Sequence, residues 1–261
     1  MPSRPPPTPP LGHGLLEGRT VVVTAAAGTG IGFATALRCA EEGATVLLSD
    51  RHARRLEACA ERLAEATDQR VRPFVCDVTS TTQVDALFEH AVRELGRVDV
   101  LVNNAGLGGT RDLVDMQDDE WARVLDVTLF GTFRCVRAAL RHMLPRRAGS
   151  IVNVGSAAGW RAQAGQSHYA AAKAGVHALT RCAAMEAAPA GVRVNAVVPS
   201  LVLHENLEKV SSAAFLESLV EKEAMRRSAE AWEVANVIVF LASDYASYLT
   251  GESISVSERR A

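Results

Sequence analysis

The sequence carries little net charge and has no long apolar run. Its 28 lysines and arginines nearly balance its 30 aspartates and glutamates, which leaves a formal net charge of −2. A chain with this balance lacks the basic face that nucleic-acid binding requires, so we expect no nucleic-acid partner. Because no apolar run reaches the roughly 20 residues of a membrane-spanning helix, we expect no membrane partner either.

Cysteine is also scarce, and its arrangement argues against two kinds of site. The five cysteines are odd in number and scattered, without the spacing of metal ligands or the density of a disulfide scaffold. They are Cys39, Cys59, Cys76, Cys135 and Cys182. We therefore expect reduced thiols in a cytoplasmic protein that has no metal site.

The first 15 residues differ in composition from the rest of the chain. The run MPSRPPPTPPLGHG has no apolar stretch of the kind that a signal peptide needs. Its prolines favour an extended and solvated conformation. We expect residues 1–15 to form a flexible arm and residues 16–261 to form one domain.

Short β-rich runs alternate with longer helical segments after this arm. The expected strands are 20–24, 45–49, 72–76, 98–102, 150–154, 193–198 and 253–256. The expected helices are 31–42, 52–67, 81–95, 118–144, 168–188 and 229–243. Because the strands are near-continuous apolar runs, both of their faces should be buried. The pattern predicts an α/β fold in which a doubly wound, seven-stranded parallel sheet carries helices on both faces.

A glycine-rich turn follows the first expected strand and opens the first helix. Glycines at such a turn let the backbone approach a pyrophosphate, and the helix N-terminus supplies N–H donors and positive potential. The residues that would bind the cofactor here are Ala25, Gly28, Thr29, Gly30 and Ile31. Tight strand–helix turns also select glycine, so the position of the motif carries more weight than its composition.

Acidic residues end the next two strands. Asp50 lies about 20 residues past the glycines, where a carboxylate suits the ribose hydroxyls of NAD and would repel the extra phosphate of NADP. Arg51 could receive that phosphate or simply be solvated, so we expect NAD, with NADP as the alternative. Asp77 and Val78 would contact the adenine, although Asp77 could also cap the following helix. Asn104, Ala105 and Gly106 end the fourth strand at the edge where ligands bind in such sheets.

Three polar residues surround the start of the helix predicted from residue 168. Tyr169 and Lys173 are four residues apart, so both lie on one face of that helix, and Ser156 ends the preceding strand. A neighbouring ammonium can lower the pKa of a tyrosine from ~10 and make it a proton donor and acceptor for a carbonyl/alcohol pair. The alternative for the pair alone is an ordinary exposed helical contact.

Taken together, these motifs resemble the short-chain dehydrogenase/reductase family over residues 16–256. The resemblance implies a single-domain Rossmann fold and an NAD(P)-dependent oxidoreductase that acts on CH–OH groups. It implies that Tyr169 exchanges a proton with the substrate oxygen, that Ser156 orients this oxygen, and that Lys173 holds the nicotinamide ribose. Pro199 and Val202 would lie beside the nicotinamide.

The sequence departs from the family pattern at several of these positions. Ala25 and one extra residue alter the glycine turn, and Pro199-Ser200 replaces Pro-Gly. Thr128 stands where the family usually has a catalytic Asn that holds a water in a proton relay, so the route of the proton is open. The run TAAAGTGIG resembles an actinobacterial subgroup linked to the breakdown of steroid rings.

The substrate is expected to be a bulky apolar carbonyl or alcohol, steroid-derived or linked to an acyl carrier. Residues 200–228 would form a lid over it, and Leu107, Trp160, Leu203 and His204 would contact it. Members of the family are usually homotetramers, which we expect here. Two alternatives remain: a catalytically degenerate nucleotide-binding relative, and an enoyl reductase, whose relatives space Tyr and Lys more widely.

Overall fold

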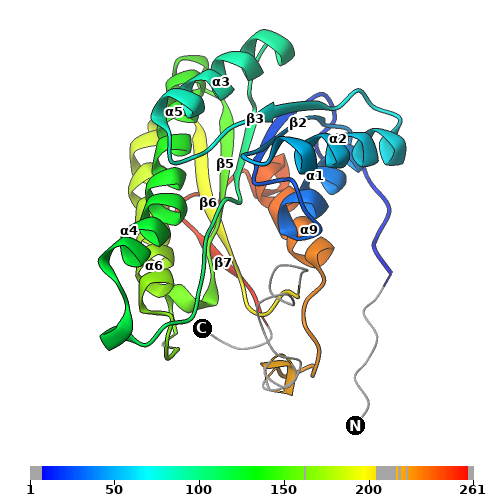
Figure 1. Cartoon of the computed structure of the whole chain (residues 1–261). Helices are drawn as coiled ribbons and strands as arrows, with labels where there is room; N and C mark the ends of the chain where they lie inside the picture. The colour runs from blue at the N-terminus through cyan, green and yellow to red at the C-terminus, as the bar shows by residue number, and fades with distance from the viewer. Residues whose placement is uncertain (1–7, 162, 204–215, 217–218, 222, 258–261) are drawn as a thin grey trace.

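A seven-stranded, all-parallel sheet forms the centre of the protein (Figure 1). The structure is a computed structural model that describes residues 8–161, 163–203, 216, 219–221 and 223–257. The strands are β1 (Thr20–Thr24), β2 (Thr45–Asp50), β3 (Arg72–Val75), β4 (Val100–Asn103), β5 (Gly149–Val154), β6 (Val192–Pro199) and β7 (Ser253–Val256). Their order in the sheet is β3-β2-β1-β4-β5-β6-β7, so the predicted doubly wound α/β fold is confirmed.

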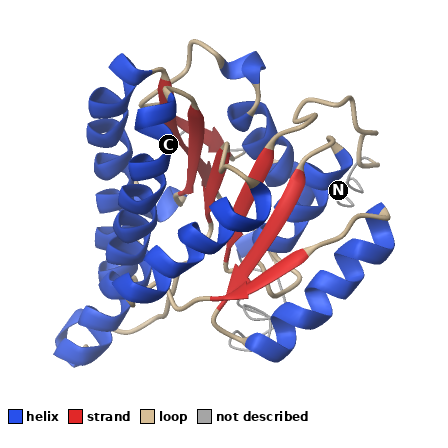
Figure 2. Ribbon diagram, turned by 90° about the horizontal axis from the view of Figure 1, so that it is seen from above, coloured by secondary structure: helices blue, strands red, loops and turns tan. Residues whose placement is uncertain are grey.

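Helices cover both faces of this sheet (Figure 2). They are α1 (Ile31–Glu41), α2 (Ala53–Thr67), α3 (Thr81–Leu95), α4 (Asp118–Leu125), α5 (Gly131–Arg146), α6 (Ser167–Ala187) and α9 (Ala231–Ala242). Helices α1, α2 and α9 pack on one face, and α3, α5 and α6 pack on the other. None of the helices in the described ranges combines the length and the hydropathy that a membrane span needs.

The apolar strands fold this way because each buries both of its faces. In β1, Val21 and Val23 join the core under α1 and α9, whereas Val22 points into the core under α3 and α5. All three valines have no exposed surface. Successive side chains of a strand point to opposite faces, so a run of valines fills two cores at once.

The sheet changes direction next to β1, and this creates the place for a site. β1 pairs with β2 on one side and with β4 on the other, both in parallel. The connections from β1 and from β4 therefore leave in opposite directions. In sheets of this kind a crevice opens outside the carboxyl ends of the strands at this point.

The segment expected as one helix over residues 118–144 is continuous but not uniform. Between α4 and α5 the backbone forms a π-helical turn over Asp126–Phe130. A π-turn inserts one residue into the helical hydrogen-bond pattern and is frequent at functional sites. Thr128 lies inside this turn and is completely buried.

The second half of the predicted arm is anchored to the domain. The Arg38 guanidinium donates hydrogen bonds to the carbonyls of Pro10 and Leu11, at 2.7 and 3.1 Å. The Glu42 carboxylate accepts from the N–H groups of His13 and Leu15, at 2.8 and 3.0 Å. Arg38 and Glu42 also pair with each other at the end of α1. Residues 10–15 are thus held by a buried ion pair, which the sequence composition did not indicate.

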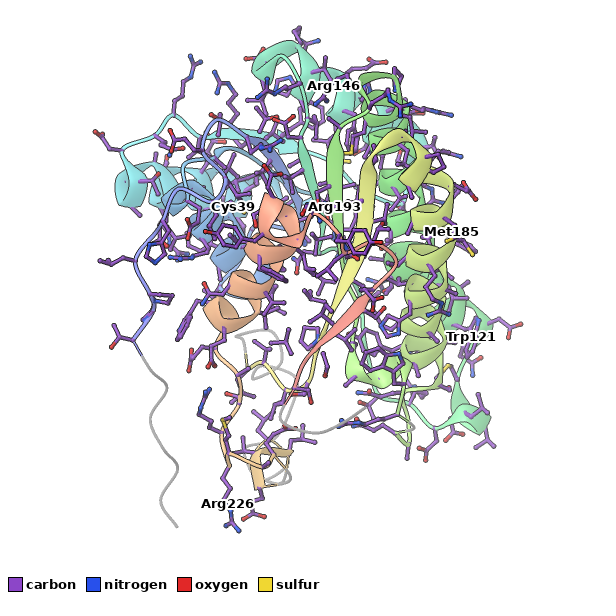
Figure 3. All side chains as sticks on the ribbon, turned by 180° about the vertical axis from the view of Figure 1, so that it is seen from behind. Cys39, Trp121, Arg146, Met185, Arg193 and Arg226 are labelled. Atoms are coloured by element: carbon purple, nitrogen blue, oxygen red, sulfur yellow. The ribbon has the colours of Figure 1, made fainter. Side chains whose placement is uncertain are left out.

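The far end of α9 is closed by an arginine from the sheet. Arg193 of β6 donates to the carbonyls of Leu241, Ala242 and Ser243, at 2.7, 3.3 and 2.9 Å (Figure 3). A cation at a helix C-terminus satisfies carbonyls that have no partner within the helix. The contact fixes α9 against the last strands of the sheet.

Candidate active site

A cleft of about 570 Å³ opens above the switch point between β1 and β4. The glycine turn forms one wall of the cleft, and it is held in place from the opposite strand. The Asn104 amide donates to the Ala25 carbonyl at 2.9 Å. A Cβ on Gly32 would lie 2.5 Å from that carbonyl, so only glycine fits there. Ala25 adopts a left-handed conformation with φ of 51°, which is uncommon for a residue with a side chain.

The N-terminus of α1 faces this cleft without a protein cap. Its N-cap residue, Gly30, has no side chain, and the first turn of the helix contains no acidic residue. The first N–H groups of a helix lack partners within the helix and carry a partial positive charge. An anionic pyrophosphate fits this position, as the sequence predicted.

Asp50 lies beside the same turn and has both carboxylate oxygens engaged. One accepts from the N–H of Ala27 at 3.2 Å and the other from the N–H of His52 at 2.9 Å. The carboxylate thereby ties the glycine turn to the start of α2. Each oxygen keeps a further lone pair, so the group can still accept hydrogen bonds from ribose hydroxyls.

Asp77 holds a turn at the end of β3. Its carboxylate accepts from the N–H and the hydroxyl of Thr79, at 2.9 and 2.8 Å. Burial raises the pKa of Asp77. The hydrogen bonds from Thr79 and the positive charges of Arg51 and Arg134 lower it by a larger amount, so the pKa lies below its usual range. The N-cap of α3 is Ser80, whose hydroxyl accepts from an N–H three residues on, and not Asp77.

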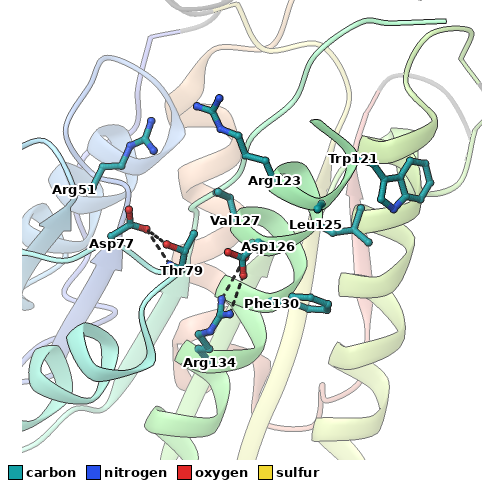
Figure 4. A pocket seen from close by; sticks show the side chains of 11 residues that line it. Arg51, Asp77, Thr79, Trp121, Arg123, Leu125, Asp126, Val127, Phe130 and Arg134 are labelled. Atoms are coloured by element: carbon teal, nitrogen blue, oxygen red, sulfur yellow. Dashed lines mark hydrogen bonds and ion pairs between the residues drawn. The ribbon is translucent and has the colours of Figure 1, made fainter. Parts of the chain in front are cut away.

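A second pocket of about 780 Å³ adjoins the cleft and shares Arg51 and Asp77 with it (Figure 4). Arg51 and Arg123 lie on its rim, and both side chains are exposed. Deeper in the pocket, Arg134 pairs with Asp126 at 2.8 Å. Arg51 and Arg123 therefore place positive charge on the rim, next to the expected position of the adenosine, while Asp77 and the paired Asp126 lie in the same pocket.

The end of β4 is fixed by a hydroxyl from β1. Thr24 Oγ1 accepts from the N–H groups of Asn104 and Ala105, at 3.0 and 3.3 Å. A Cβ on Gly106, the next residue, would lie 3.5 Å from Lys173 Nζ and 3.9 Å from Thr128 Oγ1. Gly106 is thus the residue at which the cleft meets the predicted catalytic group.

A buried polar chain below the site was not found from the sequence. The Asn103 amide donates to the Asn153 oxygen at 2.8 Å, and the Asn153 amide donates to the Thr180 hydroxyl at 2.9 Å. This chain joins β4, β5 and α6. The available signal was an Asn near the carboxyl end of each of two otherwise apolar strands. Cleft-lining residues that the sequence reading missed are Ala27, Phe33, His52, Arg55, Cys76 and Val127.

Ser156, Tyr169 and Lys173 come together at the end of β5. The Lys173 ammonium donates to the carbonyl of Val154 at 2.6 Å and lies 5.7 Å from the centroid of the Tyr169 ring. Burial lowers the pKa of Lys173 to about 8. Burial also raises the pKa of Tyr169, and a hydrogen bond with Ser156 acts in the opposite direction. Burial therefore outweighs the lowering of the Tyr169 pKa that the sequence led us to expect from Lys173.

The side chain of Thr128 contacts the backbone of Leu107, which lies in the loop after β4 and is predicted to contact the substrate. The Thr128 hydroxyl donates to the carbonyl of Leu107 at 3.1 Å and accepts from its N–H at 3.0 Å. A hydroxyl has one proton to donate, and here Leu107 receives it. The geometry is that of a brace for the loop after β4.

The residues predicted to contact the substrate or the nicotinamide differ in how deeply they are buried. The Trp160 ring packs on that of His177, with centroids 5.0 Å apart, and remains 39% exposed. Pro199 ends β6. Val202 is buried and forms an isolated parallel β-bridge with Ala229, and Leu203 follows it directly. His204 and much of the expected lid lie outside the described residues.

Comparisons with known proteins agree with this geometry. A family model described as enoyl-(acyl carrier protein) reductase matches residues 25–258. The chain is 61% identical over 247 residues to the (5R,7aS)-5-hydroxy-7a-methyl-1-oxo-2,3,5,6,7,7a-hexahydro-1H-indene-carboxyl-CoA reductase of Mycobacterium tuberculosis, covering 94% of each chain. It is 42% identical to a 3-oxoacyl-(acyl-carrier-protein) reductase of Thermotoga maritima, covering 92% of this chain and 97% of the other.

A solved structure extends the likeness to three dimensions. A short-chain dehydrogenase from Mycobacterium smegmatis superposes with a TM-score of 0.88 at 55% identity, covering 98% of both chains. The matches span nearly the whole length and include the sheet, the glycine turn and the helix that carries Tyr169 and Lys173. The chain belongs to the short-chain dehydrogenase/reductase family of oxidoreductases.

Proposed function

We propose that the protein interconverts a secondary alcohol and a ketone with NAD(P), using Tyr169 as the acid/base. The observation that carries this proposal is the convergence of Tyr169, Ser156 and Lys173 beside Gly106, where the cofactor cleft ends. An uncapped helix N-terminus and the Asp50 carboxylate fit the pyrophosphate and ribose of a dinucleotide. The bound nicotinamide supplies the hydride chemistry.

In reduction, the Tyr169 hydroxyl donates its proton to the carbonyl oxygen of the substrate. The Ser156 hydroxyl donates a second hydrogen bond to the same oxygen and holds it near Tyr169. The raised pKa of Tyr169 keeps the phenol protonated, which suits a proton donor. The Lys173 ammonium stabilises the phenolate that remains and holds the ribose hydroxyls. Proton transfer by a positioned side chain contributes roughly 10² to 10⁴ in rate.

Thr128 enters this mechanism indirectly. Its hydroxyl is paired with both backbone groups of Leu107, so we propose that it braces the substrate loop. The proton that replenishes Tyr169 then reaches Lys173 without the Asn-bound water that the family usually employs. Gly106 leaves room beside Lys173 and Thr128 for such a path.

The proposed substrate is a ring ketone or alcohol joined to a CoA thioester. The support comes from the relative at 61% identity, whose name describes a fused bicycle with a methyl, a hydroxyl, a ketone and a carboxyl-CoA group. We propose that Leu107, which lines the cleft, and Leu203 contact such rings, under a lid formed by residues 200–228. Steroid-derived rings of this kind match the subgroup that the glycine-turn sequence resembles.

We propose NAD as the cofactor, with NADP as the alternative. Asp50 favours a free ribose hydroxyl, whereas Arg51 and Arg123 on the rim of the adjoining pocket favour an extra phosphate. Affinities for NADH and NADPH, measured by fluorescence titration, decide between the two. A change of Asp50 to Ala should weaken NADH binding more than NADPH binding if the carboxylate contacts the ribose.

The decisive experiment compares wild type with Tyr169→Phe. We expect wild type to turn over cyclic ketones or their CoA-linked forms, and the variant to lose about 10²- to 10⁴-fold in kcat because the proton donor is gone. Cofactor affinity should stay within a factor of about two. Full activity of the variant would refute the mechanism. Tight cofactor binding by wild type without turnover of any carbonyl or alcohol would favour the degenerate, regulatory alternative.

We also propose that the protein is a cytoplasmic homotetramer. Small side chains at Ala171, Ala174 and Ala178 lie exposed along α6, and Phe130 and Phe133 are exposed at the start of α5. An apolar, small-residue face of this kind allows close helix packing across a twofold axis. The free cysteines support a reducing compartment. Light scattering after gel filtration measures the assembly.

A further inference from the structure

A histidine lies directly below the catalytic residues on the same helix face. Tyr169, Lys173 and His177 follow one another at intervals of four along α6, so their side chains are stacked on one side of it. His177 is 2% exposed. It stands one helical turn from Lys173.

The His177 ring occupies space that two glycines leave open. A Cβ on Gly155 would lie 2.5 Å from His177 Nε2, and a Cβ on Gly159 would lie 2.8 Å from its Cε1. Real Cβ atoms do not come this close to another atom, so the ring and the two glycines are complementary. Ser156 is the residue that follows Gly155, and its hydroxyl accepts from the N–H of Ala158 at 3.2 Å. The turn that carries Ser156 therefore rests on the His177 ring at both ends.

The far end of this turn also contacts the ring. The Trp160 ring is tilted 50° to that of His177, with centroids 5.0 Å apart. The imidazole is thus enclosed between α6 and the segment from Gly155 to Trp160. Movement of the ring would shift this segment, and Ser156 with it.

Burying the His177 ring costs more free energy than burying an apolar side chain of similar size would. Within the described part of the chain, neither ring nitrogen has a hydrogen-bond partner. Burial lowers the pKa of His177 to about 4, and the positive charges of Lys173 and Arg181 act in the same direction. The ring therefore stays neutral and adds no charge beneath Lys173. Departures from local rules of this kind are retained mainly where a site requires a particular shape.

We propose that His177 is a positioning residue, whose ring supports the turn Gly155–Trp160 and so holds the Ser156 hydroxyl toward Tyr169. The proposal rests on the proposed function, because Ser156 matters only if Tyr169 exchanges a proton with a bound carbonyl. Loss of the ring should displace Ser156 while leaving the cofactor cleft unchanged. A displacement of about 1 Å at a reacting centre can cost up to ~10²-fold in rate.

The test is a double-mutant cycle with His177→Ala, Gly155→Ala and the combined variant. We expect each single change to lower kcat by about 10- to 100-fold with little change in cofactor affinity. The added Cβ of Gly155→Ala meets two atoms of His177 first, and the carbonyl of Val197 at 3.1 Å is the next nearest atom once the ring is gone. The Gly155→Ala change should therefore cost less than about threefold in the His177→Ala background.

Two further measurements separate positioning from general stability. Because the Ser156 hydrogen bond lowers the pKa of Tyr169, the kcat/KM profile for alcohol oxidation should shift to higher pH in His177→Ala. Crystal structures of both proteins measure the distance between the Ser156 and Tyr169 oxygens, whether or not turnover is observed. We expect this distance to increase in the variant.

The outcomes are distinguishable. An unchanged oxygen–oxygen distance, or wild-type kcat and pH profile in His177→Ala, would overturn the positioning role and leave the proposed function intact. Strictly additive losses in the cycle would also overturn it. A wild-type protein that turns over no carbonyl or alcohol refutes the proposed function, and the positioning role then fails with it, whatever the packing of His177.

Discussion

Burying the Lys173 ammonium should make the protein less stable than it would be without it. The group is 3% exposed and donates a hydrogen bond to the carbonyl of Val154. Its pKa falls from 10.5 to about 8 because burial penalises the charged form. At about 1.36 kcal/mol per pKa unit, the folded state gives up about 3 kcal/mol at neutral pH. The prediction is that Lys173→Met is more stable than wild type at pH 7, while its turnover is lost.

The size of the gain follows from two opposing contributions. Methionine has a similar length and removes the charge, which recovers about 3 kcal/mol. It also leaves the Val154 carbonyl without its donor, which costs about 1 kcal/mol. The expected net increase in the free energy of unfolding is about 2 kcal/mol at pH 7.

The pH dependence has a definite sign. Below pH 8 both the folded and the unfolded chains hold the Lys173 proton, so the penalty is constant there. Between pH 8 and 10.5 the folded chain has released the proton and the unfolded chain has kept it. The stability of wild type therefore rises relative to the variant by about 1.36 kcal/mol per pH unit. By pH 9.5 the advantage of Lys173→Met should have disappeared.

Urea unfolding of both proteins at pH 7, 8, 9 and 9.5 measures this difference directly. Tyr169→Phe is the matched control, because it changes the same cluster without removing a group that titrates near pH 8. A variant that is less stable than wild type at pH 7 would refute the reasoning. So would a stability difference that stays constant over this range, because the pKa of Lys173 would then not be depressed.

Two further substitutions test the brace and the glycine turn. Thr128→Val removes both contacts between the Thr128 hydroxyl and the Leu107 backbone, and should cost about 1–3 kcal/mol of stability and raise the substrate KM. Thr128→Ser keeps the hydroxyl and should behave like wild type; equal losses in both variants would exclude the brace. Ala25→Gly relieves a left-handed conformation and should add up to about 1 kcal/mol, or a Tm increase of ~2–4 °C, without weakening cofactor binding. A lower Tm in calorimetry would contradict that expectation.

The sequence predicted the sheet well because its strands carry a strong and simple pattern. Runs such as Val21-Val22-Val23 leave no polar face, so only burial on both sides satisfies them. The helix over residues 118–144 was located correctly, but its π-turn was not predicted. The π-turn lies beside segments that are far away in the sequence: a Cβ on Gly131, the residue directly after it, would lie 2.7 Å from Val78. Periodicity alone cannot show such a contact.

Some residues of the candidate site could likewise be placed from the sequence, and others could not. Residues that share one helix, such as Tyr169 and Lys173, could be placed together from their spacing. Ser156 could be added from the strand end. The pairing of Asn103 with Asn153 and the packing of His177 could not, because each joins segments that are far apart in sequence and have no fixed spacing. The anchoring of residues 10–15 was missed for the same reason, since Arg38 and Glu42 read as ordinary helical charges.

Helix α6 constrains how this chain can change over time. Its buried side carries Tyr169, Lys173 and His177, which are spaced four residues apart. Each residue of an α-helix turns the chain by about 100°, so this spacing keeps the three side chains on one side. Insertion or deletion of one residue between Tyr169 and Lys173 would rotate everything after it by that angle and turn the ammonium away from the phenol. Substitutions on the exposed side leave the angles intact. Over residues 169–177 the exposed side of the helix can therefore vary in composition, but the spacing cannot change, and this spacing is the feature to check first in any distant relative that has lost activity.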